Sequence, residues 1–316
     1  MSTEPTADYR DRMRACADAI GLNPPAIVLP SDHFVQLADL KFHYLDWGNP
    51  QLPHLVLMHG GGLTAHTWDM AALLLREKYH IVALDMRGHG DTEWTDEARI
   101  DEDLGDLITN DVERFLDHLA LPKFSLAVMS IAGAAGMRYA AKHPERLSSL
   151  ILVDVAPEGL PEGGQATRAF HRETDILQRF EDFLERAVKF NPARKPEHIE
   201  YSLTHSLRHT DEGWTWKQDP RPRDRGQLVP DEIRRERGAK RSAELWETVK
   251  KIPVPTLVLR GEKSRGLGLE VAERTAREMP NARLVTVPGA SGFIPGDAPK
   301  DCAREVDAFL SSVPLG

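Results

Sequence analysis

Short apolar runs recur along the chain at the length of a β-strand. Each run is nearly continuous in aliphatic residues, a pattern typical of strands whose two faces are both buried in a parallel sheet. A looser alternation of apolar and polar residues over 34–47 predicts two further strands at a sheet edge. The continuous runs lie at residues 54–60, 80–86, 124–130, 149–155, 255–261 and 283–289.

Amphipathic segments separate these runs. Between Leu104 and Leu119, apolar residues fall three and four positions apart and therefore share one face of a helix. Residues 269–279 and 301–311 show the same pattern. Because strands alternate with helices, we expect an α/β protein with a mostly parallel central sheet flanked by helices and joined by right-handed crossovers.

The interval from about 157 to 240 breaks this alternation. It contains no strand-like run, but it has helical patterns at 170–189 and 196–208. Insertions after the carboxyl ends of strands lie over the ligand crevice of an open α/β sheet, so we interpret the interval as a cap. A second independent domain is the alternative, although the interval is short for a domain of about 100–150 residues. The predicted division is an N-terminal extension at 1–30, a core at 31–156 and 241–316, and a helical cap at 157–240.

Composition narrows the choice of partners. The 316 residues carry a formal net charge of -9, which argues against nucleic acid because phosphates require a basic face. No apolar run approaches the roughly 20 residues of a membrane span, and the first residues lack the apolar region of a secretory signal. We therefore expect a cytoplasmic protein that acts on a small molecule, without a nucleic-acid or membrane partner. The sequence leaves the oligomeric state open.

Cofactor motifs are missing from the sequence. Its two cysteines, Cys16 and Cys302, lie far apart, so a disulfide framework is not expected. There is no CxxC or HExxH motif, and the acidic cluster at 96–103 lacks the spacing of an EF-hand loop. The sequence predicts neither a metal nor a cofactor.

Two motifs point to acyl chemistry. HGGG, at residues 59–62, follows a predicted strand, and its glycines allow backbone N–H groups to face a developing negative charge, as in an oxyanion hole. Ser130 lies between a strand pattern and a helix pattern, where a nucleophile elbow would place its serine. The flanking positions expected to hold glycine are Val128 and Ala132, and Val128 is β-branched. A serine that merely caps the next helix is the alternative, and the residues alone favour neither.

The whole chain resembles the α/β-hydrolase superfamily, particularly bacterial hydrolases with a helical cap. The resemblance extends from about 40 to 312, and it implies the α/β-hydrolase fold with a helical cap insertion. By position, it implies Ser130 as the nucleophile and the N–H groups of Gly61 and Ile131 as the oxyanion hole. It rests on the segments HGGGLTAHTWD, ALDMRGHGDTEW, SIAGAAGMRYAAKHPERL, LILVDVAPEG, PTLVLRG and LVTVPGASGFIPGDAP.

The chain departs from the family pattern at the other two catalytic positions. The family's P-G-A-G-H segment ends in the histidine base, and Gly292 stands at that position here. The family also places an aspartate after LVLRG, where Ser264 or Arg265 stands in this chain, depending on the alignment. Asp154, at the end of LILVD, matches a place where some members keep their acid, but an aspartate is also frequent there without a catalytic role.

The base for the serine is left open. A serine hydroxyl is a poor nucleophile unless a base takes its proton, so a conventional esterase without its histidine would be very slow. Three histidines of the predicted cap, His171, His205 and His209, are placed to reach the site, and His59 and His66 lie near the glycine motif. A base must come within about 3 Å of the proton, so each of these is more typical of a surface or hydrogen-bonded residue.

The substrate site is predicted from the same motifs. Gly292 would leave space beside the serine, and a guanidinium at Arg265 would suit a carboxylate or another oxyanion. A plain exposed arginine is the alternative for Arg265. The aromatic residues suggest an apolar ligand, although aromatics at helical spacing are more often core residues. The predicted substrate-binding residues are Gly60, Trp68, Met129, Arg265, Gly292 and Phe293.

Three functions are compatible with these residues. The first is an enzyme that acts on a small, fairly apolar ester, lactone or related carbonyl compound, with a non-standard or weak base. The second is a catalytically silent or deliberately altered hydrolase fold that binds a ligand under its cap. The third is a lyase or isomerase that uses the oxyanion hole for an enolate.

Overall fold

The computed structural model describes most of the chain, and a few residues of each predicted region lie outside the description. The described residues are 6–160, 163, 165–173, 175–192 and 194–314. Those outside are 1–5 in the predicted N-terminal extension, 161, 162, 164, 174 and 193 in the predicted cap, and 315–316 in the predicted core.

An eight-stranded sheet forms the centre of the molecule, in the order β1-β2-β4-β3-β5-β6-β10-β11. The strands from β4 to β11 pair in parallel, whereas β1 and β2 form an antiparallel hairpin at one edge. The predicted strands are therefore confirmed. Their bounds are β1 (Ser31–Leu37), β2 (Leu40–Asp46), β3 (His54–Met58), β4 (His80–Leu84), β5 (Phe124–Met129), β6 (Leu147–Val153), β10 (Thr256–Gly261) and β11 (Ala282–Val287).

The strands differ in how deeply they are buried. Every residue of β4, β5, β6 and β10 is buried, as continuous apolar runs predict. The expectation that the run at 283–289 is buried on both faces is wrong, because β11 lies at the sheet edge and most of its residues are partly exposed. Its apolar run has the same pattern as the runs of the central strands, so the sequence alone did not reveal that β11 lies at the edge.

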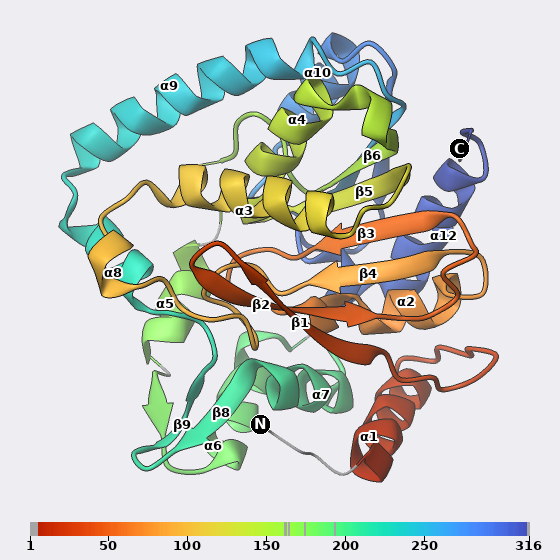
Figure 1. Ribbon diagram of the computed structural model, residues 1–316. Coiled ribbons are helices and arrows are strands. Elements are labelled where there is room, and N and C mark those ends of the chain that lie inside the picture. The colour runs from red at the N-terminus through yellow and green to blue at the C-terminus, as the bar shows by residue number, and fades with distance from the viewer. Residues whose placement is uncertain (1–5, 161–162, 164, 174, 193, 315–316) are drawn as a thin grey trace.

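Helices cover both faces of the sheet (Figure 1). Successive strand residues point to opposite faces, so Leu57 joins one hydrophobic cluster and Met58 joins the other. The first cluster includes residues of α2 and α12, and the second includes residues of α3, α4, α9 and α10. The helix bounds are α2 (Asp69–Leu75), α3 (Leu104–His118), α4 (Gly133–Lys142), α9 (Asp231–Val249), α10 (Leu269–Glu278), α11 (Ile294–Asp297) and α12 (Pro299–Leu310).

Most of the interval between β6 and β10, excluding α9 at its end, forms a group of its own, seen in the lower part of Figure 1. A hydrophobic cluster around Phe183 and Trp216 holds it together. It contains a three-stranded sheet in the order β7-β9-β8 in addition to helices. Its elements are α5 (Gln165–Glu173), β7 (Ile176–Leu177), α6 (Phe180–Phe190), α7 (Pro196–Ser206), β8 (Leu207–Thr210), β9 (Gly213–Trp216) and α8 (Arg221–Leu228).

The sequence-based description of this interval as purely helical is wrong. Its strands have two to four residues each, too short for a recognisable apolar run. The predicted helix at 170–189 is two helices, α5 and α6, separated by β7. Helix α9 crosses the predicted cap boundary at 240 and packs against α4 of the core.

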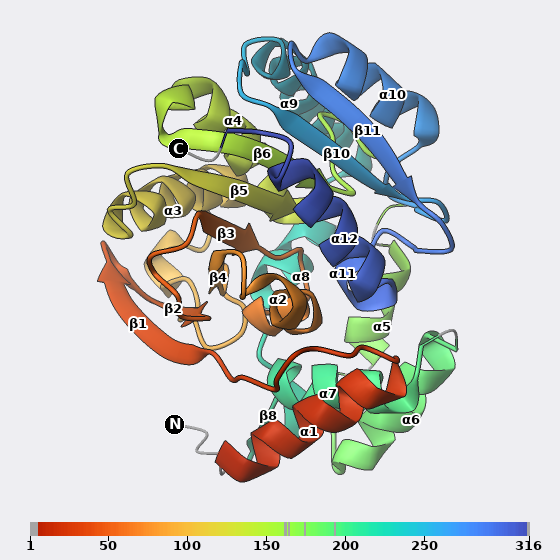
Figure 2. The same ribbon diagram turned by 90° about the vertical axis from the view of Figure 1, so that its right-hand side faces the viewer.

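The N-terminal segment folds as helix α1 (Thr6–Ala19), which packs along α7 of the cap (Figure 2). Its buried residues Met13 and Cys16 also join the hydrophobic cluster that contains α2. In the described part of the chain, no helix has the length and apolar character needed to cross a membrane.

Candidate active site

Ser130 occupies a sharp turn between strand β5 and helix α4. It begins the short 3₁₀ helix η3 (Ser130–Ala132), and its φ of +51° lies in the left-handed region that residues with a Cβ rarely adopt. Ser130 is exposed, and the N-cap positions of η3 and of helix α4 are occupied by Met129 and Ala132. Ser130 therefore does not occupy an N-cap position, and its left-handed backbone is the geometry expected of a nucleophile elbow.

The bulk of Val128 is accommodated by a glycine on the helix. A Cβ added at Gly136 would lie 2.6 Å from Cγ1 of Val128, so the helix approaches this strand closely only because residue 136 has no side chain. Gly133 makes room for Val155 in the same way, because a Cβ at Gly133 would overlap the Val155 side chain. The small residues needed at the elbow thus lie on the helix face rather than beside the serine.

The HGGG loop lies against the elbow. A Cβ at Gly60 would lie 3.0 Å from the Cβ of Ser130 and 3.1 Å from Cε of Met129. A Cβ at Gly61 would lie 3.2 Å from Cγ2 of Ile131. Ile131 also lies in the first helical turn, where N–H groups have no partner within the helix. The structure therefore brings together these five residues, which were predicted from the sequence.

His59 supports this loop and does not face the serine. Its side chain is fully buried, its Nδ1 donates to the Gly60 carbonyl at 2.7 Å, and its Nε2 accepts from the Met86 N–H at 3.0 Å. Burial, followed by the neighbouring His89, lowers the pKa of His59 to about 4. The imidazole is therefore neutral at physiological pH, and both its nitrogens are already engaged.

Asp154 directly follows strand β6, next to Ser130 in the sheet. Met129 pairs with Val153 in the parallel ladder, so Ser130 and Asp154 are the next residues on strands about 4.8 Å apart. Asp154 also has a φ of +51°. Its carboxylate accepts hydrogen bonds from the Gly261 N–H at 3.0 Å and from the Ser264 hydroxyl at 2.6 Å. Burial raises the pKa of Asp154, although these hydrogen bonds oppose the shift.

The carboxylate of Asp154 lies where a side chain at residue 292 would begin. A Cβ at Gly292 would overlap Oδ2 of Asp154 and would lie 3.1 Å from its Cγ. The sequence predicted open space at this position, and the structure instead places an acid against it. The strand-ending motif LILVD carried the signal for Asp154, but only the pairing of β5 with β6 places it beside the serine.

Ser264 and Arg265 have different surroundings. The Ser264 hydroxyl accepts hydrogen bonds from the N–H groups of Gly266 and Leu267 at 3.1 and 3.0 Å and donates to Asp154. Ser264 thus fixes the loop and the carboxylate together. The side chain of Arg265 is exposed, and the ion pairs found among the described residues do not include it.

The two aromatic residues predicted at the substrate site also differ. Trp68 is 2% exposed and packs in the main hydrophobic core. Phe293 is half-buried, and the Arg194 guanidinium lies over its ring, with Cζ of Arg194 4.2 Å from the ring centre of Phe293. Arg194 comes from the cap and forms an ion pair with Asp297 at 2.6 Å, so the cap is fastened to the loop that carries Gly292.

The three cap histidines reach different places. His171 lies against the HGGG loop, because a Cβ at Gly62 would lie 2.7 Å from its Cε1. Its Nδ1 lies 2.9 Å from Oε1 of Gln218, and its ring stacks on Trp216. His209 is exposed beside Trp214. The ring of His205 stacks on that of His66, with centres 3.7 Å apart, and is described below.

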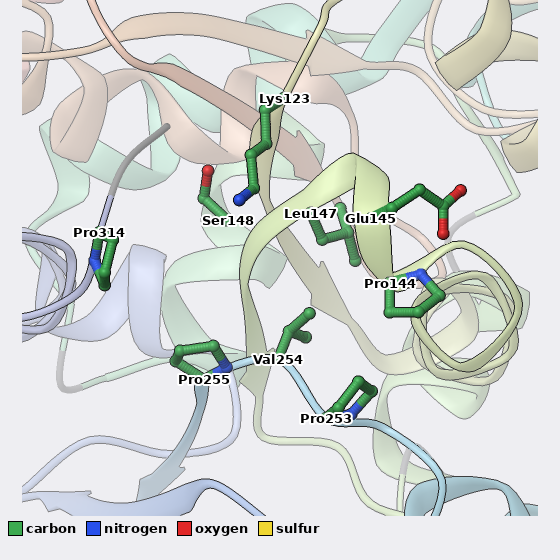
Figure 3. Close-up of a pocket in the computed structure, with 9 residues that line it drawn as sticks. All are labelled: Lys123, Pro144, Glu145, Leu147, Ser148, Pro253, Val254, Pro255 and Pro314. Atoms are coloured by element: carbon green, nitrogen blue, oxygen red, sulfur yellow. The ribbon is translucent and has the colours of Figure 1, made fainter.

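A surface hollow of about 400 Å³ lies at the opposite end of the strands (Figure 3). Lys123 precedes β5, Leu147 begins β6 and Pro255 precedes β10, so the hollow marks the amino ends of these strands. Ser130 follows the carboxyl end of β5, and the hollow is therefore not part of the candidate site.

The arrangement of elbow, glycine loop and parallel sheet corresponds to a known family. The sequence profile of the alpha/beta hydrolase family matches residues 55–305. The chain belongs to this family. The expectation drawn from the sequence motifs is thereby confirmed for family and fold.

This hydrolase is similar to several proteins of known activity. Esterase Rv0045c of Mycobacterium tuberculosis (strain ATCC 25618 / H37Rv) is 27% identical over 305 residues, covering 94% of this chain and 93% of the relative. 2-Hydroxy-6-oxo-6-(2'-aminophenyl)hexa-2,4-dienoic acid hydrolase of Metapseudomonas resinovorans is 24% identical over 295 residues, covering 89% and 91%. These relatives support an esterase-like hydrolase.

Solved structures agree in fold. A structure of the M. tuberculosis esterase Rv0045c, described with its inhibition by transition metals, matches with a TM-score of 0.73 and 24% identity, covering 96% of this chain and 99% of that one. E-2-(acetamidomethylene)succinate hydrolase matches with a TM-score of 0.75 and 17% identity, covering 89% and 99%.

Proposed function

We propose that this hydrolase cleaves a small, fairly apolar ester, lactone or related carbonyl compound. Ser130 is the nucleophile, and the N–H groups of Gly61 and Ile131 bind the oxyanion. The single observation that carries the proposal is the left-handed backbone of Ser130, which holds an exposed hydroxyl against the HGGG loop. A strained residue of this kind persists only where the surrounding structure enforces it, and such residues gather at functional sites.

We assign the missing base to Asp154. Asp154 follows the strand that pairs with β5 and so neighbours the serine in the sheet, and its carboxylate lies against the position that holds the base in related enzymes. A carboxylate is a weaker base than an imidazole, but burial raises the pKa of Asp154 and so strengthens it as a base. The residual acceleration from an oxyanion hole and binding alone is roughly 10³–10⁴ over water, and a weak base adds to it. We therefore expect modest turnover.

The proposed reaction has two stages. In the first, Asp154 takes the Ser130 proton as Oγ attacks the carbonyl carbon, and the oxyanion forms against the two N–H groups. The intermediate collapses to an acyl-serine, and the departing alkoxide receives the proton from Asp154. In the second stage, a water molecule attacks the acyl carbon through its oxygen while Asp154 takes one of its protons. Asp154 then returns that proton to Oγ of Ser130 as the carboxylic acid is released.

The surroundings of the serine support an apolar substrate. Met129 and Ile131 flank it on the chain, and His171 of the cap borders the glycine loop at Gly62. The half-buried ring of Phe293 lies next to Gly292 in the loop fastened to the cap. The substrate is proposed to lie between these groups, with its acyl part toward Met129 and Ile131.

A silent, ligand-binding hydrolase fold is the second candidate. It is favoured by the hydrogen bonds of Asp154, because both carboxylate oxygens are engaged by Gly261 and Ser264 as they would be in a purely structural acid. In that case, Asp154 would fix two loops together and would take no proton.

Labelling with a fluorophosphonate and turnover of chromogenic esters distinguish the two candidates. The intact protein is expected to form one adduct, located on Ser130 by peptide mass spectrometry. Ser130→Ala should lose both adduct and turnover, whereas Ser312→Ala, a surface control, should keep both. Asp154→Asn should lower kcat at least tenfold while the variant remains folded. A folded protein without adduct or turnover would favour the silent fold.

A further inference from the structure

Three potential metal ligands meet where the core, the cap and helix α1 come together. His66 belongs to the 3₁₀ helix η1 (Ala65–Trp68), Asp69 begins α2, and His205 lies near the end of cap helix α7. One ligand atom from each of the three residues lies within 4.8 Å of the other two. The cluster is separate from the proposed catalytic groups, although His66 follows the oxyanion loop by only a few residues.

Two atoms of this cluster are buried without a hydrogen-bond partner in the part of the chain that the structure describes. They are Oδ1 of Asp69 and Nε2 of His205. The two residues are 0% and 8% exposed. Burying a polar atom without a partner is costly, and such atoms are rare in folded proteins unless an ion or water completes the site. The cluster therefore has two buried polar atoms that the described residues leave without a partner.

The charge of Asp69 supports the same conclusion. Its second oxygen, Oδ2, accepts hydrogen bonds from the Tyr201 hydroxyl and from Nδ1 of His66, the latter at 2.8 Å. The Tyr9 hydroxyl also lies 3.4 Å from this oxygen. Among the described residues, His66 is the sole basic group within ion-pair distance of Asp69, and it carries charge only when protonated. A divalent cation would neutralise this buried carboxylate.

We propose that His66, Asp69 and His205 form a site for a divalent transition metal, of which Zn²⁺ is the typical example. Two imidazoles and one carboxylate match the ligands that Zn²⁺ takes in proteins. Tyr201 and Tyr9 hold one carboxylate oxygen, and such outer contacts fix the orientation of a metal ligand. Hard cations such as Mg²⁺ prefer all-oxygen ligands and are not expected to bind.

The site would connect the cap to the core. Zinc holds its ligands at about 2.0–2.2 Å, so the three side chains would adjust around the ion from their present separations, all within 4.8 Å. Because His205 is on α7 and the other two ligands are on the core, binding would link α7 to the segment that follows the HGGG loop. The metal is therefore expected to stabilise the fold and to fasten the cap.

The test uses the full chain without a polyhistidine tag, first treated with a chelator that is then removed. Zn²⁺ is titrated by calorimetry, and the thermal unfolding midpoint is measured with and without it. We expect one Zn²⁺ per chain and, at about 100 times the dissociation constant, a rise of the midpoint on the order of 5 °C. Mg²⁺ at the same concentration should leave the midpoint unchanged.

Variants assign the binding to these residues. His205→Phe keeps a ring that can stack on His66 and removes both nitrogens, so it should fold and lose the Zn²⁺ effect. His209→Phe, an exposed cap histidine, is the matched control and should keep it. His66→Gln provides a second test if His205→Phe does not fold. The proposal is overturned if the intact chain shows no saturable binding, or if the His205 and His66 variants bind Zn²⁺ as the intact chain does.

Discussion

At the scale of single residues, the contact between Asp154 and Gly292 bears most directly on the proposed site. Asp154 lies against Gly292, so a carboxylate occupies the space where a side chain at residue 292 would begin. Restoring a histidine at residue 292 would require that carboxylate to move, because even a Cβ overlaps it. The absence of a side chain at residue 292 and the position of the Asp154 carboxylate therefore belong together, which the separate sequence motifs did not show.

Ser264→Ala tests whether Asp154 is the base. The Ser264 hydrogen bond lowers the pKa of Asp154, so its removal should raise that pKa further. Asp154 must be ionised to accept a proton, and the acid limb of the pH profile of kcat/KM should move to higher pH. One hydrogen bond of about 1 kcal/mol corresponds to a shift of roughly 0.5–1 pH unit. The measurement is the pH profile of ester hydrolysis.

Two further variants complete this test. Ser264→Thr retains a hydroxyl and should keep the acid limb near its original pH. Asp154→Asn cannot be protonated in this range and should lose the limb together with most of the activity. An acid limb that stays in place in Ser264→Ala would contradict the assignment of Asp154 as the base.

At the scale of elements, the packing of α4 on β5 makes the elbow possible. The family pattern has glycines beside the serine, and this chain has a valine there instead. Gly136 compensates, because its missing side chain leaves room for Val128. The two residues are therefore expected to be energetically coupled although they are eight positions apart in sequence.

A double-mutant cycle on Gly136→Ala and Val128→Ala measures this coupling. Each single change should destabilise the protein, the first by crowding and the second by leaving a cavity, at about 1–3 kcal/mol apiece. The double variant should lose at least about 1 kcal/mol less than the sum, because the added methyl group fills the space left by the valine. Urea unfolding gives the free energies.

Gly238→Ala on α9 is the control for helix propensity, since nothing lies within 4 Å of a Cβ there. It should stabilise the protein by up to about 1 kcal/mol, as an alanine in a helix interior does. Additivity of the two changes at 128 and 136 within about 0.5 kcal/mol would argue against the proposed coupling.

At the scale of the whole molecule, buried histidines link stability to pH in two directions. Burial is the main cause that lowers the pKa of His59 and of His198 to about 4. For His43, burial opposes protonation, but hydrogen bonds to Asp32 and Asp85 raise its pKa to about 10. An unfolded chain holds all three near the ordinary value of about 6.5.

The free energy of unfolding is therefore expected to be greatest near pH 6.5. As the pH falls from 6.5 toward 4, the unfolded chain binds protons at His59 and His198 that the folded protein rejects, so stability falls. As the pH rises from 6.5 toward 10, the unfolded chain has lost the proton that folded His43 keeps, so stability falls again. Each proton contributes a slope of about 1.4 kcal/mol per pH unit.

Urea unfolding at pH 5, 6.5 and 9 checks this expectation. His43→Gln should flatten the alkaline side and leave the slope of the acid side in place. Stability that rises steadily from pH 6.5 to pH 9 in the intact protein would show that the pair of His43 with Asp85 does not dominate the alkaline range.

The sequence identified the parts of the candidate site better than their arrangement. Ser130 and the HGGG loop were predicted to meet, and the structure places them in contact. Trp68 was expected near the substrate but packs in the core, because its apolar position fits either environment. The cap was expected to be helical, and its short strands gave no periodic signal. The cluster of His66, Asp69 and His205 was not foreseen at all.

By itself, the sequence determined the alternation of strands and helices, the family, and the placement of Ser130 between a strand and a helix. These follow from local patterns, since a strand buried on both faces must be apolar along its whole length. Only the tertiary structure decided that Asp154 stands beside Gly292 and that His205 lies on His66. Those contacts depend on strand order and on how the cap packs, which bring together side chains far apart in sequence.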